Sequence, residues 1–527
     1  MTMDTFAPLM FAGLVIVLLI GFPVAFSLTA LGLGCGFYAV WMGWFPASFM
    51  SALPLNVFGI LSNDLLLAIP FFTLMGTILE RCGLAEDMLD SMGQLFGPMR
   101  GGLGYSVIIV GFILGAITGT VAGQVIAMAM ISLPVMMRWG YNMRYATGVL
   151  AASGTITQLV PPSLVLIVLA DQLGKPVGDM YKGAWGPSII QVLLFALYTF
   201  MLSRIKPAHV PGVPKEGRTL EGWPLWRKCL SGIIPSAVLI FTVLGSMGGL
   251  PGLNTAIATP TEAGAMGAVG AFILAAMHKR LTLDLLKQAL LSTMRLTAMV
   301  EFILIGSRVF SLVFQGVDGG IWIEHMLAGL PGGQLGFLIA VNIFIFFLAF
   351  FLDFFEIAFI IIPFLAPVAA KLGIDLVWFG VMICVNMQTS FMHPPFGFAL
   401  FYLRGIADTL FKNKSLPRKV ESSDIYMGAI PWIFLQLILV AIVIFFPQTV
   451  TVFLDKEKTL DLDKASEQIQ QMGGGRTQQP APSLDPAKGL SPAGGASAAA
   501  PGASAAPADE DPMEAVRRAL DQDKAKK

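Results

Sequence analysis

The first 450 residues alternate long apolar runs with short polar loops. A helix needs about 20 apolar residues to cross a bilayer, and runs of this kind recur along this whole part of the chain. The candidate membrane segments lie at 5–20, 23–42, 64–80, 104–121, 124–138, 144–171, 185–204, 228–249, 257–277, 298–315, 334–352, 354–370, 377–404 and 425–449. Several of them are too short or too interrupted to be plain spans. The pattern predicts an all-α, polytopic membrane protein that lies in a lipid bilayer.

Two shorter stretches are amphipathic. Apolar residues recur at helical spacing in 85–97 and in 282–296, with charged residues on the opposite face. Helices of this type lie in the interface plane of a membrane. Elsewhere, Thr259, Pro260 and Glu262 have the spacing of a helix start, with Thr as the N-cap, Pro at the first helical position and Glu at the third.

Composition sharpens this division of the chain. Of the 527 residues, 56% are apolar and 13% are charged, whereas about a quarter are charged in soluble domains. Residues 451–527 alone hold 22 of the 66 charges, and their Gly, Ala, Pro and Ser content is typical of a disordered linker. This tail ends in a short predicted helix from Asp511, which is either a docking peptide or an inert end.

Net charge and cysteine content narrow the class of protein. The net charge is zero and there is no basic stripe, which argues against nucleic acid as a partner. The four cysteines are too scattered to suggest a disulfide framework or a zinc site.

Basic residues gather in two loops, one between 204 and 228 and the other between 404 and 419. By the positive-inside rule both loops are cytoplasmic. The predicted organisation is a first half at 1–204, a cytoplasmic loop at 205–227, a second half at 228–450 and a disordered polar tail at 451–527.

The two halves match each other at a fixed offset of 233 residues. Pro134, Gly140 and Pro161-Pro162 are repeated as Pro367, Gly373 and Pro394-Pro395. The segment ending near Asp171 is followed by one more apolar run before a basic loop, whereas the segment ending at Arg404 enters such a loop directly. The two ends therefore face opposite sides, which is the arrangement of inverted repeats.

Each Pro-Pro pair interrupts an apolar stretch. Proline removes a backbone donor and disfavours helical backbone in the residue before it, so we expect the stretches 144–171 and 377–404 to be broken helical hairpins. Non-helical backbone at membrane depth persists only where it lines protein or a water-filled cavity. Broken helices at matching positions of two inverted halves predict the central site of a secondary transporter. Prolines that serve only packing are the alternative.

Polar residues cluster near these breaks. The run 116–124 interrupts an apolar segment with glycines and hydroxyl groups, whose oxygen atoms are hard ligands suited to sodium. Asp353 stands 233 residues after Thr120, and Glu356 follows one turn later. Carboxylates inside a membrane are costly and usually line a polar pathway, although a buried structural network is the alternative. Arg308 is a candidate anchor for a substrate carboxylate, unless it pairs within the membrane or snorkels to its surface.

Several motifs are spread over both halves of the chain. They are Ile117 to Thr120, Leu133 to Tyr141, Gly154 to Ser163, Pro260 to Ala263, Asp353, and Asn386 to Gly397. Together they resemble the large membrane subunit of the tripartite ATP-independent periplasmic (TRAP) transporters, and the resemblance extends over residues 5–450. It implies an ion-transporter-superfamily-like fold, with a scaffold and an elevator transport domain that carries two re-entrant helical hairpins.

The resemblance also implies partners, a substrate and a location. The partners are a small four-helix TRAP membrane subunit and a periplasmic substrate-binding protein, and the location is the bacterial inner membrane. No cofactor is implied apart from Na⁺ as the coupling ion. The implied sodium ligands are Thr118, Gly119, Thr120, Gly154, Thr157, Pro161, Asp353, Gln388, Thr389 and His393. The candidate substrate contacts are Ser163, Glu356, Asn386, Ser390 and Arg308.

The chain departs from the family pattern at three places. Thr118-Gly119-Thr120 stands where the family often has Ser-Gly-Ser, and Gln124 stands where an Asp is common. His393 replaces the usual Thr before the second Pro-Pro pair. Hydroxyl groups are retained at the first place, whereas the ligands of the second ion site are altered.

The predicted function is sodium-coupled, binding-protein-dependent import of organic acids by an elevator-like mechanism. The alternative is a channel-like protein, or another secondary transporter of organic anions that works without a binding protein. An intramembrane enzyme is disfavoured because the four histidines form no His-Glu-x-x-His pattern and no Gly-x-Ser-x-Gly elbow occurs.

Overall fold

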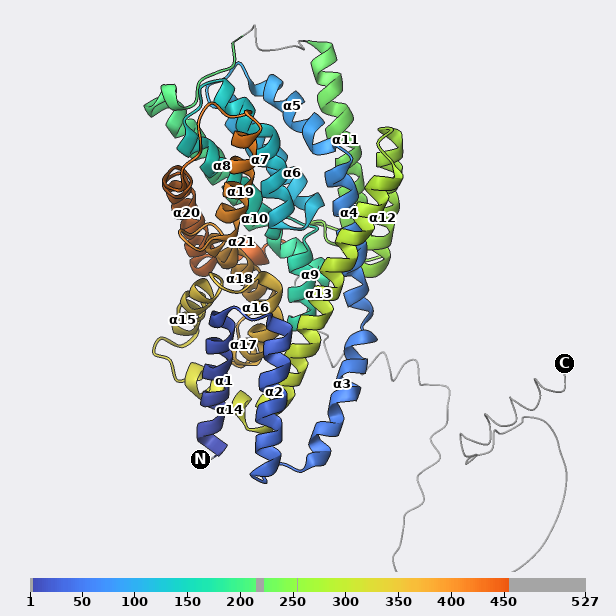
Figure 1. Cartoon of the computed structure of the whole chain (residues 1–527), viewed down its shortest axis with the longest axis vertical. Coiled ribbons are helices and arrows are strands. Elements are labelled where there is room, and N and C mark those ends of the chain that lie inside the picture. The colour runs from blue at the N-terminus through green and yellow to red at the C-terminus, as the bar shows by residue number, and fades with distance from the viewer. Residues whose placement is uncertain (1–2, 215–221, 254, 455–527) are drawn as a thin grey trace, which may run out of the picture. The chain divides into compact units, whose positions relative to one another are not determined.

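The computed structural model describes residues 3–214, 222–253 and 255–454 (Figure 1). These residues form helices joined by short loops, and no strand occurs among them. The predicted tail helix from Asp511 and part of the predicted cytoplasmic loop lie outside the described residues.

The helices follow one another closely along the chain. Those of the first half are α1 (Met3–Ile20), α2 (Val24–Trp41), η1 (Ala47–Ser51), α3 (Ala52–Leu61), η2 (Asp64–Leu67), α4 (Ala68–Arg81), α5 (Leu84–Phe96), α6 (Gly102–Thr118), α7 (Val121–Arg138), α8 (Met143–Thr155), η3 (Ile156–Gln158), α9 (Leu164–Leu173), α10 (Val177–Ile205) and η4 (Pro207–His209). Those of the second half are α11 (Trp223–Ser246), α12 (Pro260–Met277), α13 (Leu283–Gly316), α14 (Gly319–Ala328), α15 (Gly333–Leu348), α16 (Phe354–Ile360), α17 (Ile362–Lys371), α18 (Leu376–Ser390), α19 (Phe398–Lys412), α20 (Ser422–Phe445) and α21 (Gln448–Thr451).

Many of these helices are long and apolar enough to cross a bilayer. Within the described ranges seven helices meet this condition, or up to nine if each of two bent helix pairs is one span. Their outward faces carry many exposed Leu, Ile, Phe and Met side chains. Such surfaces are solvated by lipid, so the chain is a multi-pass membrane protein.

One group of helices forms a frame. Helices α2, α4, α11, α12 and α13 pack against one another, and α4, α11 and α12 lie together on the right in Figure 1. Glycine allows the backbones to approach closely, because a methyl group at Gly32 of α2 would lie 2.9 Å from the backbone nitrogen of Phe310 on α13. Small residues at helix contacts are a general device of membrane proteins.

The rest of the chain repeats one structural unit in each half. In the first half, α6 and α7 form a helical hairpin, and α8 and α9 are two short helices separated by the Pro161-Pro162 break. In the second half, α15 with the bent pair α16 and α17 takes the place of the hairpin, and α18 and α19 flank the second break. The halves interlock, since α7 packs against α19 and α16 packs against α9.

The structure confirms the two breaks but changes their shape. Helix α8 packs mainly against α20 and α7, whereas α9 packs against α18, α10 and α16. In Figure 1, α8 lies toward one end of the described unit and α9 toward its middle. The stretches 144–171 and 377–404 are therefore discontinuous helices with diverging arms, and the tight chain reversal of the first half lies one element earlier, between α6 and α7.

Other predictions are confirmed or corrected. The helix start at Thr259 is a capping box, in which the hydroxyl oxygen of Thr259 accepts from the backbone N–H of Glu262 at 3.3 Å and Glu262 accepts from the N–H of Thr259 at 2.8 Å. The stretch 282–296 is helical as predicted, but it is the first part of the continuous 34-residue α13 and no separate interfacial helix. Residues 47–61, for which no element was predicted, form η1 and α3 and meet the next helices at a bend of 46°.

The two basic loops meet at one end of the unit. Backbone N–H groups of Gly101 and Asn142 donate to the carbonyl oxygens of Val210 and His209. Residues 414–417 of the other loop line a cavity with the C-terminal end of α7. Both basic loops therefore lie beside the same segments, as a common side of the membrane requires.

Candidate ion and substrate site

The tip of the first hairpin is short, with only two residues between α6 and α7. Helix α6 ends at Thr118, Gly119 adopts the left-handed region with φ +65°, and Thr120 is extended and precedes α7. Glycine is the residue that takes such a φ without strain. This turn reverses the chain and leaves the hydroxyls of Thr118 and Thr120 beside the ends of two helices.

A buried amide fastens this tip to the first broken helix. Gln124, on the first turn of α7, donates to the carbonyl oxygens of Gly111 at 2.6 Å and Ser153 at 2.8 Å. Its amide oxygen accepts from the hydroxyl of Thr118 at 3.0 Å and from that of Thr157. All four hydrogen-bonding positions of the amide are thus used.

The hydrogen bonds to Gln124 determine which way the hydroxyl groups of Thr118 and Thr157 face. Each hydroxyl group has one proton and two acceptor lone pairs. Thr118 donates its proton to Gln124, and the single proton of Thr157 is shared between Gln124 and the carbonyl oxygen of Gly154 at 2.9 Å, so the lone pairs of both hydroxyl groups face elsewhere. Oxygen atoms of this kind suit a hard cation.

The remaining first-half candidates lie at the break itself. Pro161 is buried there, and Ser163 caps α9, with its hydroxyl oxygen accepting from the N–H of Val165 at 3.2 Å and its proton donated to the carbonyl oxygen of Gln158 at 2.7 Å. Ser163 therefore has a structural role as a cap, in addition to its predicted contact with substrate.

In the second half, Asp353 and Glu356 form a second capping box. Asp353 is the N-cap of α16, and Glu356 accepts from its backbone N–H at 2.9 Å. Both side chains are half-buried. The two carboxylates lie together at the start of a helix, where the positive end of the helix dipole favours negative charge.

His393 lies next to the same turn. Its ring is 5.3 Å from the ring centre of Phe350 and 5.4 Å from that of Phe346, and Nδ1 is 2.7 Å from the carbonyl oxygen of Pro394. Phe396 packs against Phe351 at 5.3 Å. The second break and the turn before Asp353 thus meet through aromatic side chains.

Four candidates on α18 point in different directions. Asn386 donates to the carbonyl oxygen of Asn342 on α15 at 2.8 Å. Gln388 and Gln191 of α10 exchange two amide hydrogen bonds of 3.2 Å each. The hydroxyl of Thr389 donates within its own helix, to the carbonyl oxygen of Val385 at 3.3 Å. Ser390 is completely buried, and its hydroxyl has no hydrogen-bond partner in the described part of the chain.

Arg308 stands apart from these groups. It is exposed on α13, a helix of the frame, and no ion pair joins it to any described carboxylate. Its neighbour Ser307 points to the repeat unit and donates to the carbonyl oxygen of Phe359 on α16. The structure therefore brings the other candidates to the two breaks, but not Arg308.

The donor set fits a sodium ion. Apart from the imidazole of His393, it consists of hydroxyl, carbonyl and carboxylate oxygens, which are the ligands of hard cations, and unwound carbonyls of this kind hold Na⁺ in other transporters. In the described ranges no group of three or more His, Cys, Asp or Glu residues is placed to hold a metal ion. Buried oxygens without a hydrogen-bond partner occur close to both breaks, on Ser153 and Gln158 in one half and on Ser390 in the other.

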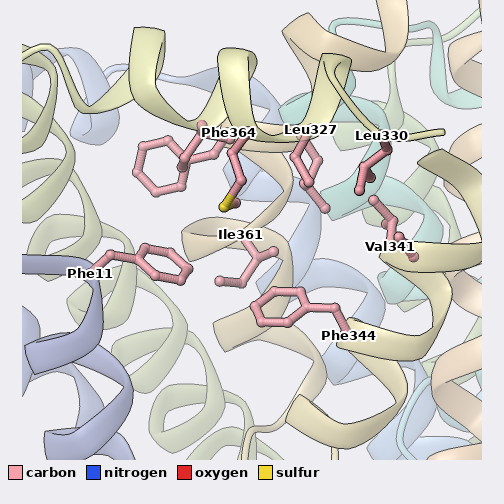
Figure 2. Close-up of a pocket in the computed structure, with 11 residues that line it drawn as sticks. Phe11, Leu327, Leu330, Val341, Phe344, Ile361 and Phe364 are labelled. Carbon is pink, nitrogen blue, oxygen red and sulfur yellow. The ribbon is translucent and has the colours of Figure 1, made fainter. Parts of the chain in front are cut away.

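Two cavities differ in the polarity of the residues that line them. A cavity of about 250 Å³ lies between α15, α17, α14 and α1, and Figure 2 shows that Phe11, Phe344 and Phe364 are among its apolar lining residues. It offers no group to hold a carboxylate. A larger cavity of about 630 Å³ lies between α5, α6 and α7 and includes Ser106, Ser132 and Arg138.

Some residues of the site were not among the sequence candidates. The sequence marks Gln124 only as a departure from the family pattern, and Gln191 and Asn342 are not among the predicted residues. Glu80 of α4 lies beside the first tip, where a methyl group at Gly123 would be 2.8 Å from its Oε2. A carboxylate at the end of an apolar run is itself a signal that could have identified Glu80.

The fold defines a class of protein, namely multi-pass helical membrane proteins with discontinuous helices. The described helices match the crystal structure of the Alcanivorax borkumensis YdaH transporter with a TM-score of 0.55 and 14% sequence identity, over 84% of this chain and 98% of that one. Agreement at this level of identity concerns the fold.

The sequence comparisons show the family. Residues 11–449 match the family model of the tripartite ATP-independent periplasmic transporter, DctM component. The chain therefore belongs to this family of TRAP transporter large permease subunits. It is 29% identical over 458 residues to the C4-dicarboxylate TRAP transporter large permease protein DctM of Rhodobacter capsulatus, which covers 84% of this chain and 97% of the relative.

Relatives with other substrates in their names match at similar identity. The 2,3-diketo-L-gulonate TRAP transporter large permease protein YiaN of Escherichia coli is 25% identical over 82% of this chain and 95% of its own length. The sialic acid TRAP transporter large permease protein SiaM of Vibrio cholerae is 25% identical over 75% and 87%. These relatives are transporter subunits, and the chain is accordingly no enzyme.

Proposed function

We propose that this large permease subunit imports an organic acid with a carboxylate group, and that an inward sodium gradient drives the import. The observation that carries the proposal is the repeated unit, in which a turn between helices meets the break of a discontinuous helix in each half. In the first half, Gln124 joins the tip of the α6–α7 hairpin to the broken helix of α8 and α9. Such paired breaks supply the half-helix ends and free carbonyls that secondary transporters use for ions and anionic substrates.

The names of relatives and the candidate site support the proposed substrate class. C4-dicarboxylate, 2,3-diketo-L-gulonate and sialic acid, named for three relatives, are all acids. Polar side chains beside the breaks, with Ser163, Asn386 and Ser390 as candidates, would contact such a substrate, and Glu356 would border it. Arg308 on the frame would meet a carboxylate only after a relative movement of frame and repeat unit.

The proposed mechanism is elevator-like alternating access. The frame of α2, α4, α11, α12 and α13 would serve as the scaffold, and the repeat units with both breaks would move against it. The extensive packing within the frame and the interlocking of the two repeat units support this division. The proposed re-entrant elements are the α6–α7 hairpin and its counterpart, the chain from α15 to α17.

The proposed partners are those of the family: a small four-helix membrane subunit and a periplasmic substrate-binding protein, with the complex in a bacterial inner membrane. Transport would be tested by reconstituting the chain with the small subunit and candidate binding proteins in liposomes. We expect uptake of an organic acid that requires the binding protein and an inward sodium gradient. Uptake without a binding protein would favour the alternative, a transporter or channel of organic anions that works alone.

A further inference from the structure

Glu80 brings a carboxylate from the frame to the tip of the first hairpin. It lies on α4, is half-buried, and has no hydrogen bond or ion pair with the described residues. Its neighbour Arg81 attracts it electrostatically, but the hydrogen bond of Arg81 goes to Gln288 on α13. A carboxylate in an apolar helix without a fixed partner is costly and marks a candidate functional site.

The space in front of this carboxylate is kept free by Gly123. A methyl group at Gly123, on the first turn of α7, would lie 2.8 Å from Oε2 of Glu80 and 3.0 Å from Oγ1 of Thr120. Both oxygens therefore face the same small volume. Any larger residue at this position would fill it.

Backbone carbonyl oxygens at the end of α6 also face α4 close to Glu80. A methyl group at Gly76, one turn before Glu80, would lie 2.6 Å from the carbonyl oxygen of Ile117 and 2.9 Å from that of Thr118. These two residues end α6, and the last carbonyls of a helix have no partner within it. One helical turn of four residues advances about 6 Å, so the carbonyls and the carboxylate lie along one short stretch of α4.

We propose that Glu80 is the carboxylate ligand of a sodium site between α4 and the tip of the first hairpin. The inference rests on the proposed sodium coupling and adds a ligand from the frame. Thr120 would contribute its hydroxyl, and Gly123 would leave room for the ion. Because Glu80 belongs to the frame and Thr120 to the hairpin, this full set of ligands exists only in one relative position of the two, and Glu80 leaves the ion when the hairpin moves.

Another role for Glu80 leads to a different result. A carboxylate near the N-terminus of α7 also stabilises that helix through its dipole. In that case the loss of the charge would lower stability equally at every sodium concentration. A ligand of the ion would instead change the dependence of stability on sodium.

The test uses the full chain purified with its small subunit in detergent. The melting temperature is measured against NaCl concentration, with choline chloride keeping the ionic strength constant. Glu80→Gln and Gly123→Ala are the test variants. The controls are Glu86→Gln, at an exposed residue of α5, and Gly405→Ala, at an exposed glycine of α19 with open space around it.

For the wild type and both controls we expect the same saturable rise in melting temperature with sodium. For Glu80→Gln and Gly123→Ala we expect the half-saturating sodium concentration to rise at least tenfold. If Glu80→Gln cannot be purified intact, Gly123→Ala decides, because it retains the carboxylate. Wild-type sodium dependence in both test variants would overturn the assignment of Glu80.

The same experiment separates this inference from the proposed function. A wild type whose melting temperature does not depend on sodium would remove the basis of sodium coupling itself. A wild type that responds to sodium while Glu80→Gln responds identically would leave sodium coupling intact and contradict only the role of Glu80. A response of the wild type to protons and not to sodium, lost in Glu80→Gln, would also contradict the sodium site.

Discussion

Gln124 is predicted to hold the first hairpin to the first broken helix, and its replacement tests that interpretation. Gln124→Leu keeps a similar volume but removes all four hydrogen bonds that the amide makes, to Gly111, Ser153, Thr118 and Thr157. Hydrogen bonds between membrane helices contribute about 0.6 kcal/mol on average and up to about 1.7. For four bonds at one buried residue we therefore expect a loss of roughly 2–4 kcal/mol in the free energy of unfolding.

The assay is unfolding of the purified protein by heat or by increasing SDS in mixed micelles. Gln315→Leu is the matched control, because Gln315 is exposed on α13; a change there should stay within about 0.5 kcal/mol. A double-mutant cycle adds a second readout: Thr157→Val should cost about 1 kcal/mol in the wild type and much less in Gln124→Leu. Equal stability of Gln124→Leu and Gln315→Leu would refute the reasoning.

Three further predictions concern the second half and the first tip. Asp353→Asn should abolish or uncouple sodium-driven uptake, and expression should stay normal because Asn is as good an N-cap as Asp. The control is Asp375→Asn, at the N-cap of α18. Full transport by Asp353→Asn would mean that the Asp353 carboxylate has a structural role. Gln191→Leu and Gln388→Leu should each destabilise by about 1 kcal/mol, while the double variant should cost less than the sum, because no amide is left unpaired; strictly additive melting data would contradict the exchange of hydrogen bonds. Gly119→Ala should lower stability by about 1 kcal/mol or more, since its φ of +65° is left-handed, and an unchanged unfolding curve would argue against that turn.

Much of the helical architecture could be predicted from the sequence. Hydropathy identifies most membrane segments, and the offset of 233 residues identifies the repeat, because proline and glycine act on the local backbone. Hydropathy did not find α3, whose run of residues is short and followed by polar Ser62-Asn63-Asp64. Nor could it show that 282–296 continues into one long helix, since an amphipathic face and an apolar run can belong to the same element.

The placement of the candidate residues could be predicted only in part. The prolines mark the two breaks, yet the reversal of the first half lies between α6 and α7, because Gly119 turns the chain there. Gln124 makes its hydrogen bonds only because α6, α7 and α8 lie side by side, and the sequence alone does not show this packing. Glu80 is 40 residues before Thr120 in the chain, so only tertiary packing brings the two oxygens to Gly123.

Sodium-coupled import is tested most directly by a measurement that follows both solutes at once. Entry of radioactive sodium and of a labelled organic acid would be recorded in liposomes that contain the chain, its small subunit and the cognate binding protein. We predict that the acid accumulates only with an inward sodium gradient, and that sodium enters with it in a fixed ratio. Accumulation that is unchanged when an ionophore collapses the sodium gradient would contradict the account.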